Sequence, residues 1–179
     1  YSVKGLENLN PSSNYIFAGN HASMFDIPLA FAGLPYWLVP IAKKELKSVF
    51  ILGWIMNTAG HIWVDRKRSE DALKSLARAK ASLKSMPRSI LLFPEGTRTK
   101  DGSLGSFKKG GLLLSKETNI PIVPIAFIGT YNLLNKNSFK MHGNRLELRV
   151  GKPLPVKESF FENKNELAKN IRLRVEELL

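Results

Sequence analysis

One segment of the sequence, Asn20-His21-Ala22-Ser23-Met24-Phe25-Asp26, carries both a fold signal and candidate chemistry. It follows the run Tyr15-Ile16-Phe17-Ala18-Gly19, in which apolar residues of high β-propensity end at a glycine. A short apolar run of this kind predicts a buried strand, and α/β proteins place their functional residues beyond the carboxyl ends of strands. We therefore expect residues 20–26 to lie at the functional edge of a sheet.

His21 and Asp26 are the candidate proton-transfer pair in this segment. Imidazole accepts a proton near neutral pH, and a nearby carboxylate can fix its tautomer and stabilise the cation that forms. Residues five apart lie about 140° from one another around a helix, so the two side chains cannot share a helical face. We expect a helix that begins near Phe25, with His21 folded back towards Asp26 from the preceding loop. The same residue types also fit an ordinary helix start with a structural histidine.

Composition limits the class of protein. The 179 residues fit one domain over residues 1–179, and the absence of cysteine excludes disulfides and thiolate metal sites. The formal charge of +12, from 27 basic and 15 acidic residues, indicates an anionic partner or surface. Signatures of nucleic-acid-binding modules are missing, which favours a membrane or a phosphorylated substrate and argues against nucleic acid.

Three long uncharged stretches, at residues 27–42, 49–64 and 119–135, approach the length of a membrane span. Prolines, glycines or polar residues interrupt each of them, and none reaches the roughly 20 apolar residues that a span requires. We interpret them as buried core, with docking on lipid as the alternative. The chain begins at Tyr1 without a methionine, so a preceding membrane anchor stays possible.

The remaining pattern alternates strands and helices, which predicts an α/β fold. Residues 1–13 are expected to pack on a sheet edge, and the two prolines in the apolar run 120–128 suit an edge, a bulge or a pocket wall. Further strands are expected at 37–41, 60–64, 89–93 and 145–150. Helices are expected from Leu46 to near Gly60, from Ser69, over 112–117 and after Asn163.

A second polar cluster, Glu95-Gly96-Thr97-Arg98, follows the most strand-like run of the chain, Ser89 to Phe93, after Pro94. Glycine lets a backbone approach a ligand closely, and the amides of Gly96 and Thr97 could donate to an oxyanion. Arg98 offers a planar fork suited to phosphate. We therefore interpret this loop as functional.

Two basic positions have alternative interpretations. Lys43 and Lys44 follow the predicted strand 37–41 and are either a solvated helix start or phosphate ligands on the same rim as His21. Arg66, after the run Gly60 to Asp65, is on its own pattern best explained with Asp65 as a surface pair that caps the next helix.

Four clusters thus occur in one order: Asn20 to Asp26, Gly60 to Arg66, Phe93 to Arg98, and Val123-Pro124-Ile125. This arrangement, over about residues 14 to 130, resembles the glycerolipid acyltransferases of the 1-acylglycerol-3-phosphate acyltransferase type. The first and third clusters carry the resemblance, and Trp63 is a mild departure from it in the second. The resemblance implies a central mixed, largely parallel β-sheet flanked by helices.

The resemblance also implies a reaction. His21 would be the general base that takes the proton of a lysophosphatidic acid hydroxyl as it attacks a thioester carbonyl, and Asp26 would orient it. Phosphatidic acid would form without an acyl-enzyme, so Ser23 is not proposed as a nucleophile. The acyl donor would be a thioester of acyl carrier protein or of coenzyme A, and no cofactor or metal is expected.

The remaining site residues follow from the same resemblance. Glu95, Gly96, Thr97 and Arg98 would form the substrate site, with the Gly96 amide at the oxyanion. Lys43 would join Arg98 in binding the phosphate, and Arg66 would shape the phosphate side. The acyl wall is assigned to two residues of the fourth cluster, Val123 and Pro124. The expected location is the cytoplasmic face of the cell membrane, on an anionic surface.

Alternative functions stay open at this stage. Within the acyltransferases, the acceptor could be glycerol 3-phosphate or another lysophospholipid. A metal-dependent hydrolase using His21, Asp26, His61 and Asp65 is disfavoured, because the spacing matches no metal motif. A basic, non-enzymatic module that binds anionic lipid would explain the charge but not the two polar clusters.

Overall fold

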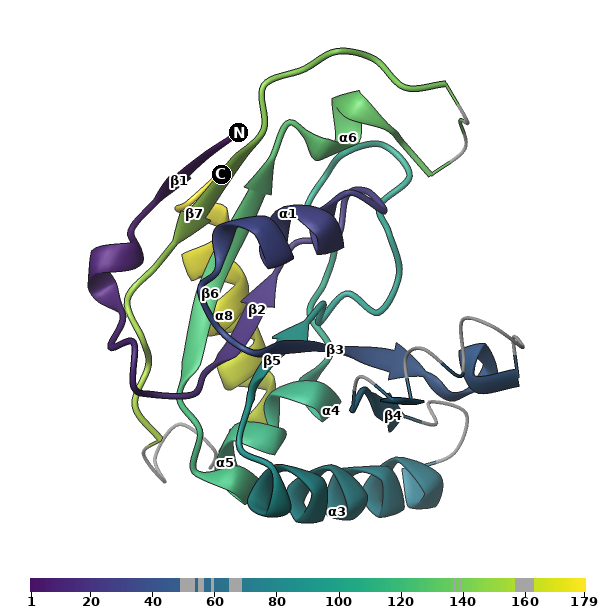
Figure 1. Cartoon of the computed structure of the whole chain (residues 1–179), viewed down its shortest axis with the longest axis vertical. Helices are drawn as coiled ribbons and strands as arrows, with labels where there is room; N and C mark the ends of the chain where they lie inside the picture. Colours follow the sequence, from purple (N-terminus) through teal and green to yellow (C-terminus); the bar gives the residue numbers. More distant parts are fainter. Residues whose placement is uncertain are drawn as a thin grey trace.

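A computed structural model describes residues 1–48, 54, 57–58, 60–64, 69–136, 138, 140–156 and 163–179. In this part of the chain, a seven-stranded sheet with the order β1-β7-β6-β2-β5-β3-β4 is flanked by helices (Figure 1). Neighbouring strands are parallel except β6 and β7, which are antiparallel. The expected mixed, largely parallel sheet is therefore confirmed.

The elements agree closely with the sequence pattern. The strands are β1 Ser2–Lys4, β2 Ile16–Gly19, β3 Leu38–Lys43, β4 Ile62–Val64, β5 Ser89–Leu92, β6 Ile122–Ile128 and β7 Glu147–Val150. The helices are α1 Asp26–Gly33, α3 Ser69–Ser85, α4 Lys109–Leu112, α5 Leu114–Thr118, α6 Thr130–Leu133 and α8 Lys164–Glu176, with short 3-10 turns at Leu6–Asn8 and Lys44–Ser48. Most of the helix expected from Leu46 to near Gly60 lies outside the described residues.

Helices cover both faces of the sheet, which explains why its central strands are apolar without alternation. Phe17 of β2 packs on the face covered by α1, together with Leu29 of that helix. Its neighbour Ile16 packs on the opposite face, with Leu83 of α3 and Ile171 of α8. In Figure 1, α1 lies in front of the sheet and α8, in yellow, lies behind it.

Strand β6 contains Pro124, and the sequence suited this proline-containing run to an edge, a bulge or a pocket wall. It lies between β2 and β7, and a β-bulge, one of the alternatives, accommodates Pro124. Ile125 pairs with Val150, and Ile122 pairs with Leu154. Between these two pairs β6 advances by three residues and the facing segment 150–154 by four, so the facing segment has one extra residue. The extra residue lies where the Gly151 N–H donates to the Pro124 carbonyl at 2.8 Å.

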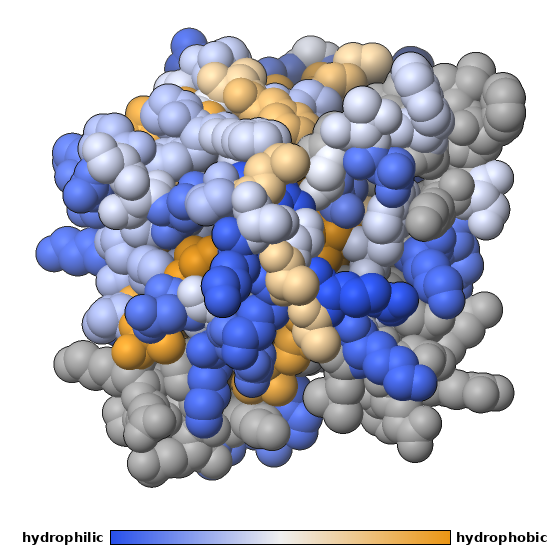
Figure 2. All heavy atoms as spheres, turned by 60° about the horizontal axis from the view of Figure 1, so that its bottom comes forward, coloured by the Kyte–Doolittle hydropathy of each residue, from blue (hydrophilic) through white to orange (hydrophobic). Residues whose placement is uncertain are grey.

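One face of the molecule is largely hydrophilic. Figure 2 turns the bottom of Figure 1 towards the viewer and shows hydrophilic residues over much of this face, with hydrophobic residues between them. Among the described residues, no helix has both the length and the apolar character needed to cross a membrane.

Candidate active site

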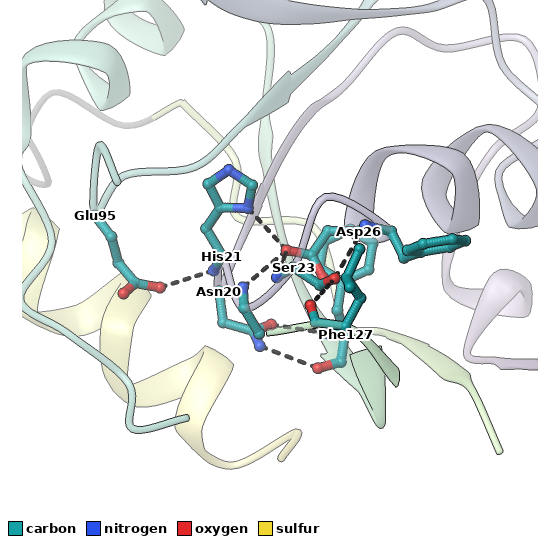
Figure 3. Close-up of polar contacts among 9 residues, drawn as sticks. Asn20, His21, Ser23, Asp26, Glu95 and Phe127 are labelled. Atoms are coloured by element: carbon teal, nitrogen blue, oxygen red, sulfur yellow. Dashed lines mark hydrogen bonds and ion pairs between the residues drawn. The ribbon is translucent and has the colours of Figure 1, made fainter. Parts of the chain in front are cut away.

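His21 and Asp26 meet as the sequence predicts (Figure 3). β2 ends at Gly19 and α1 begins at Asp26, so a short loop carries His21 back towards the first turn of the helix. His21 Nδ1 lies 2.8 Å from Asp26 Oδ2, and Asp26 is fully buried. The same oxygen accepts hydrogen bonds from the backbone N–H groups of Ala22 at 2.8 Å and Ser23 at 2.9 Å.

These contacts determine which of the two ring nitrogens of His21 carries the proton. An ionised carboxylate only accepts hydrogen bonds, so Nδ1 must carry a proton that it donates to Asp26. In the neutral ring, Nε2 then has a free lone pair. Figure 3 shows this second nitrogen directed away from Asp26, and 17% of the His21 side chain is exposed. This geometry suits the general-base role that the sequence predicts for His21.

Glu95 holds the backbone of His21 rather than presenting its carboxylate outward. Its Oε1 accepts the His21 backbone N–H at 2.8 Å, and its Oε2 accepts the Gly105 N–H at 3.2 Å. Glu95 is buried, and this burial raises the pKa of its carboxyl, although the two N–H donors oppose the shift. Both carboxylate oxygens of Glu95 thus have protein partners in this structure. Its expected contact with substrate stays a prediction.

Neighbouring strands supply further contacts to the His21 loop. The imidazole stacks on the ring of Phe93, which follows β5, with ring centroids 3.9 Å apart and an angle of 16°. The side-chain amide of Asn20 forms two hydrogen bonds with the backbone of Phe127 in β6. Its oxygen accepts the Phe127 N–H at 2.8 Å, and its nitrogen donates to the Phe127 carbonyl at 3.0 Å. Ser23 Oγ donates to the Leu134 carbonyl at 2.6 Å, which supports a structural role for this serine.

The loop after Glu95 differs in part from expectation. Gly96 has a φ of 76°, in the left-handed region that glycine adopts readily. Its N–H donates to the Phe93 carbonyl at 3.0 Å and closes the turn, and its expected place at an oxyanion stays a prediction. Thr97 Oγ1 accepts from Lys136 Nζ at 3.1 Å, and no described residue forms a hydrogen bond or ion pair with the half-buried Arg98.

Two further candidate residues are not placed. Lys43 is the last residue of β3, but its side chain lies outside the description, and Arg66 lies outside the described residues altogether. Their phosphate-binding roles stay predictions.

The two acyl-wall candidates are buried in β6, paired with Phe17 and Ala18 of β2. Val123 packs in the core beneath α1, and Pro124 contacts Gly151. Successive residues of a strand point to opposite faces, so at most one of the two side chains can face a given pocket. The acyl wall stays a prediction.

The metal-hydrolase alternative gains no support from the described residues, among which no group of three or more His, Cys, Asp or Glu side chains could hold a metal ion. Asp65, one of its four proposed ligands, lies outside them.

Sequence patterns did not indicate the contacts of Asn20, Phe93 and Gly105. Asn20 and Phe93 are the first residues of two recognised clusters, but their partners are distant in sequence. The glycine content of the 99–111 segment was the only signal that could have indicated Gly105.

The structure combines a largely parallel α/β sheet with a His–Asp pair beyond β2 and an Arg-containing loop beyond its neighbour β5, which is where enzymes of this fold class place their active sites. Residues 1–128 match the protein family described as Acyltransferase. The chain therefore belongs to the acyltransferase family.

Individual relatives agree with the family assignment. The chain is 34% identical over 154 residues to 1-acyl-sn-glycerol-3-phosphate acyltransferase alpha of Ovis aries, which covers 86% of this chain and 54% of that protein. It is 32% identical over 170 residues to the protein of the same name from Homo sapiens, covering 95% of this chain and 60% of that one. The chain thus spans little more than half the length of these relatives.

A solved structure agrees at the level of the fold. The crystal structure of the 1-acyl-sn-glycerophosphate (LPA) acyltransferase PlsC from Thermotoga maritima superposes with a TM-score of 0.80 at 30% identity. The superposition covers 99% of this chain and 71% of that one.

Proposed function

We propose that the chain transfers a fatty acyl group from an acyl thioester to the free hydroxyl of 1-acyl-glycerol-3-phosphate, forming phosphatidic acid. The observation that carries the proposal is the 2.8 Å contact of His21 Nδ1 with buried Asp26, which leaves Nε2 as a base. The relatives from Ovis aries and Homo sapiens are named for this acceptor.

The reaction then needs one base and no acyl-enzyme. Nε2 of His21 takes the hydroxyl proton as the oxygen attacks the thioester carbonyl, and a tetrahedral intermediate forms. The intermediate collapses with cleavage of the C–S bond, and the imidazolium returns its proton to the departing thiolate. Asp26 stabilises the imidazolium between these two steps. The net change is one ester formed, one thioester consumed and one thiol released.

The phosphate of the acceptor is proposed to bind at Arg98, with contributions from Lys43 and Arg66. Arg98 forms no hydrogen bond or ion pair within the described chain, so its guanidinium is available to an anion. Thr97 and Gly96 would complete this side of the site, and Val123 or Pro124 would lie near the acyl chain.

The charge of +12 favours binding to an anionic membrane surface and to an acidic acyl donor. We propose the cytoplasmic face of the cell membrane as the location, with acyl carrier protein or coenzyme A carrying the acyl group. No cofactor is needed by the proposed chemistry. Glycerol 3-phosphate or another lysophospholipid is the alternative acceptor.

The test is an incubation of the protein with anionic vesicles, lysophosphatidic acid and an acyl thioester, following phosphatidic acid and free thiol. The proposal expects product from the wild type and a rate lower by about 10²- to 10⁴-fold in His21→Ala, the usual contribution of a general base. His142→Ala is the matched control, since this exposed histidine lies in the loop after α6.

Each result separates the candidate functions. Thiol release without phosphatidic acid would indicate a hydrolase or another acceptor, which glycerol 3-phosphate and other lysophospholipids would then test. Vesicle binding without either product, equal in wild type and His21→Ala, would replace the proposal by the basic lipid-binding module.

A further inference from the structure

The C-terminal helix α8 contributes a side chain to the loop beside the candidate site. Ile171 and Val175 of α8 are fully buried, and Arg172 lies next to them at the margin of the packed face. Arg172 Nε donates to the Gly105 carbonyl at 3.1 Å, and Nη2 donates to the Leu104 carbonyl at 3.2 Å. A guanidinium is planar and stays charged at any pH of interest, so it fixes these two carbonyls relative to α8.

The peptide that Arg172 contacts is the peptide that reaches Glu95. Leu104 supplies its carbonyl and Gly105 supplies its N–H, and this N–H donates to Glu95 Oε2 at 3.2 Å. A cation on the carbonyl oxygen polarises the peptide and strengthens the hydrogen bond of its N–H. A Cβ at position 105 would lie 2.8 Å from Glu95 Oε2, so only glycine permits this approach.

The other oxygen of Glu95 leads to the proposed base. Oε1 accepts the backbone N–H of His21 at 2.8 Å, and the His21 carbonyl in turn accepts the N–H of Thr99 at 2.8 Å. The peptide groups on both sides of His21 are thus held by the segment 95–105 (Figure 3 shows the Glu95 contact). Arg172, Leu104–Gly105, Glu95 and His21 form an unbroken series of hydrogen bonds.

We infer that Arg172 is a positioning residue that holds the backbone of His21 through Gly105 and Glu95, and so sets the direction of the His21 imidazole. The inference rests on the proposed function only for its kinetic consequence. Arg172 lies 44 residues beyond residue 128, where the family match ends. Its effect falls on the orientation of the base, so it changes kcat rather than the affinity for substrate.

The test compares Arg172→Leu with Arg174→Leu on the same helix. Arg174 is exposed, and its Nε donates to Asn170 of α8 at 2.9 Å, so its loss leaves the loop contacts in place. Arg172→Leu is expected to lower kcat about tenfold with KM unchanged, since small misplacements of a reacting group have effects of this order. Arg172→Lys keeps the positive charge but lacks the planar guanidinium that donates to two carbonyls at once, so its kcat should lie between those of Arg172→Leu and the wild type.

A second measurement does not depend on activity. The backbone amide resonances of Gly105 and His21 in ¹H–¹⁵N spectra report the two hydrogen bonds to Glu95. Both are expected to shift in Arg172→Leu and to stay in place in Arg174→Leu. If Arg172 acts through Glu95, the effects of Arg172→Leu and Glu95→Gln on kcat will also be non-additive.

Several outcomes would overturn the inference. Unchanged His21 and Gly105 resonances in a folded Arg172→Leu protein would exclude the coupling, as would equal kcat in the two arginine variants of an active enzyme. If Arg172→Leu fails to fold, Arg172→Lys takes its place. Shifted Gly105 and His21 amide resonances in Arg172→Lys would then support the coupling, and resonances unchanged from the wild type would refute it. A wild type that transfers no acyl group would refute the proposed function alone, because the resonances still test the series of hydrogen bonds.

Discussion

Replacement of Asp26 by asparagine tests the charge in the proposed His–Asp pair without changing its shape. Oδ2 of Asp26 accepts from His21 Nδ1, Ala22 N–H and Ser23 N–H, and an amide oxygen in the same place can accept all three. The variant should therefore keep the tautomer of His21. What it removes is the negative charge beside the imidazolium that forms during the reaction.

The size of the effect follows from the geometry. With Nδ1 2.8 Å from Oδ2, the centres of the two charges are about 4 Å apart, and at an effective dielectric constant of about 20 they attract by about 4 kcal/mol. This energy corresponds to roughly 10³ in rate, and the 17% exposure of the His21 side chain lowers the expectation towards about 10². We expect kcat to fall by this factor of about 10² to 10³, with KM nearly constant.

Stability must be measured alongside activity. Asp26 Oδ1 is buried and has no hydrogen-bond partner among the described residues, so the new NH₂ group would be buried without an acceptor, at a cost of about 1–3 kcal/mol. Thermal unfolding gives this cost, and Glu7→Gln, at an exposed glutamate in the turn Leu6–Asn8, is the matched control for kcat. A folded Asp26→Asn protein with kcat within about threefold of the wild type would refute the role of the charge.

Two more predictions concern the surroundings of the pair. Phe93→Leu removes the ring stacked on His21, and a pair of this kind contributes about 0.5–1.5 kcal/mol, so steady-state kinetics should show kcat lower by about 3- to 10-fold with KM for the thioester unchanged. An unaltered kcat would show that Asp26 alone orients the ring. For Asp101, hydrogen bonds from Ser103 and Thr99 lower the pKa of the carboxyl to about 2. Its charged form therefore stabilises the fold above the unfolded pKa of about 3.9, and this contribution is lost as the pH falls towards about 2. The melting temperature of Asp101→Asn should lie below that of the wild type at pH 7 and converge with it as the pH falls from 4 to 2; a constant difference would contradict this assignment.

The fold could be predicted largely from local pattern. Apolar runs gave the strands at 15–18 and 89–93, and the His21 to Asp26 spacing required the loop-to-helix transition that the structure has at residue 26. The capping residue Asn163 marked the start of α8, and its side chain accepts from the N–H groups of Asn165 and Glu166. These features depend on residues within one turn or one strand, which is why sequence alone indicates them.

Features that depend on distant partners could not be predicted. Arg88 is 1% exposed, and its guanidinium donates to the carbonyls of Gly60, Ser82 and Met86, although nothing in its local sequence distinguishes it from a surface arginine. The oxyanion role expected for the Gly96 amide stays a prediction, because it depends on a bound substrate as well as on the turn that this amide closes with Phe93.

Glu95 shows the same limit within the site. A carboxylate after a buried strand suggests substrate contact, but its partners are backbone N–H groups of His21 and Gly105, 74 and 10 residues away in sequence. The sheet order makes the first contact possible, since β5 is the parallel neighbour of β2 and their carboxyl ends lie together. Backbone donors carry no sequence signal, so side-chain identity alone could not reveal this partner.

The geometry therefore separates two tasks along the edge of the sheet. Asp26, Glu95 and Phe93 all contact His21 itself, through its ring or its backbone, so changes to them should alter the rate of the chemical step. Arg98 has no partner among the described residues, so its loss should weaken binding of the phosphate and leave the base in place. If both groups of variants changed KM and kcat alike, the base and the anion site would not be independent. The hydrogen bonds from Glu95 through Gly105 to Arg172 would then be the physical connection to examine, because they join the Arg98 loop, the His21 loop and α8.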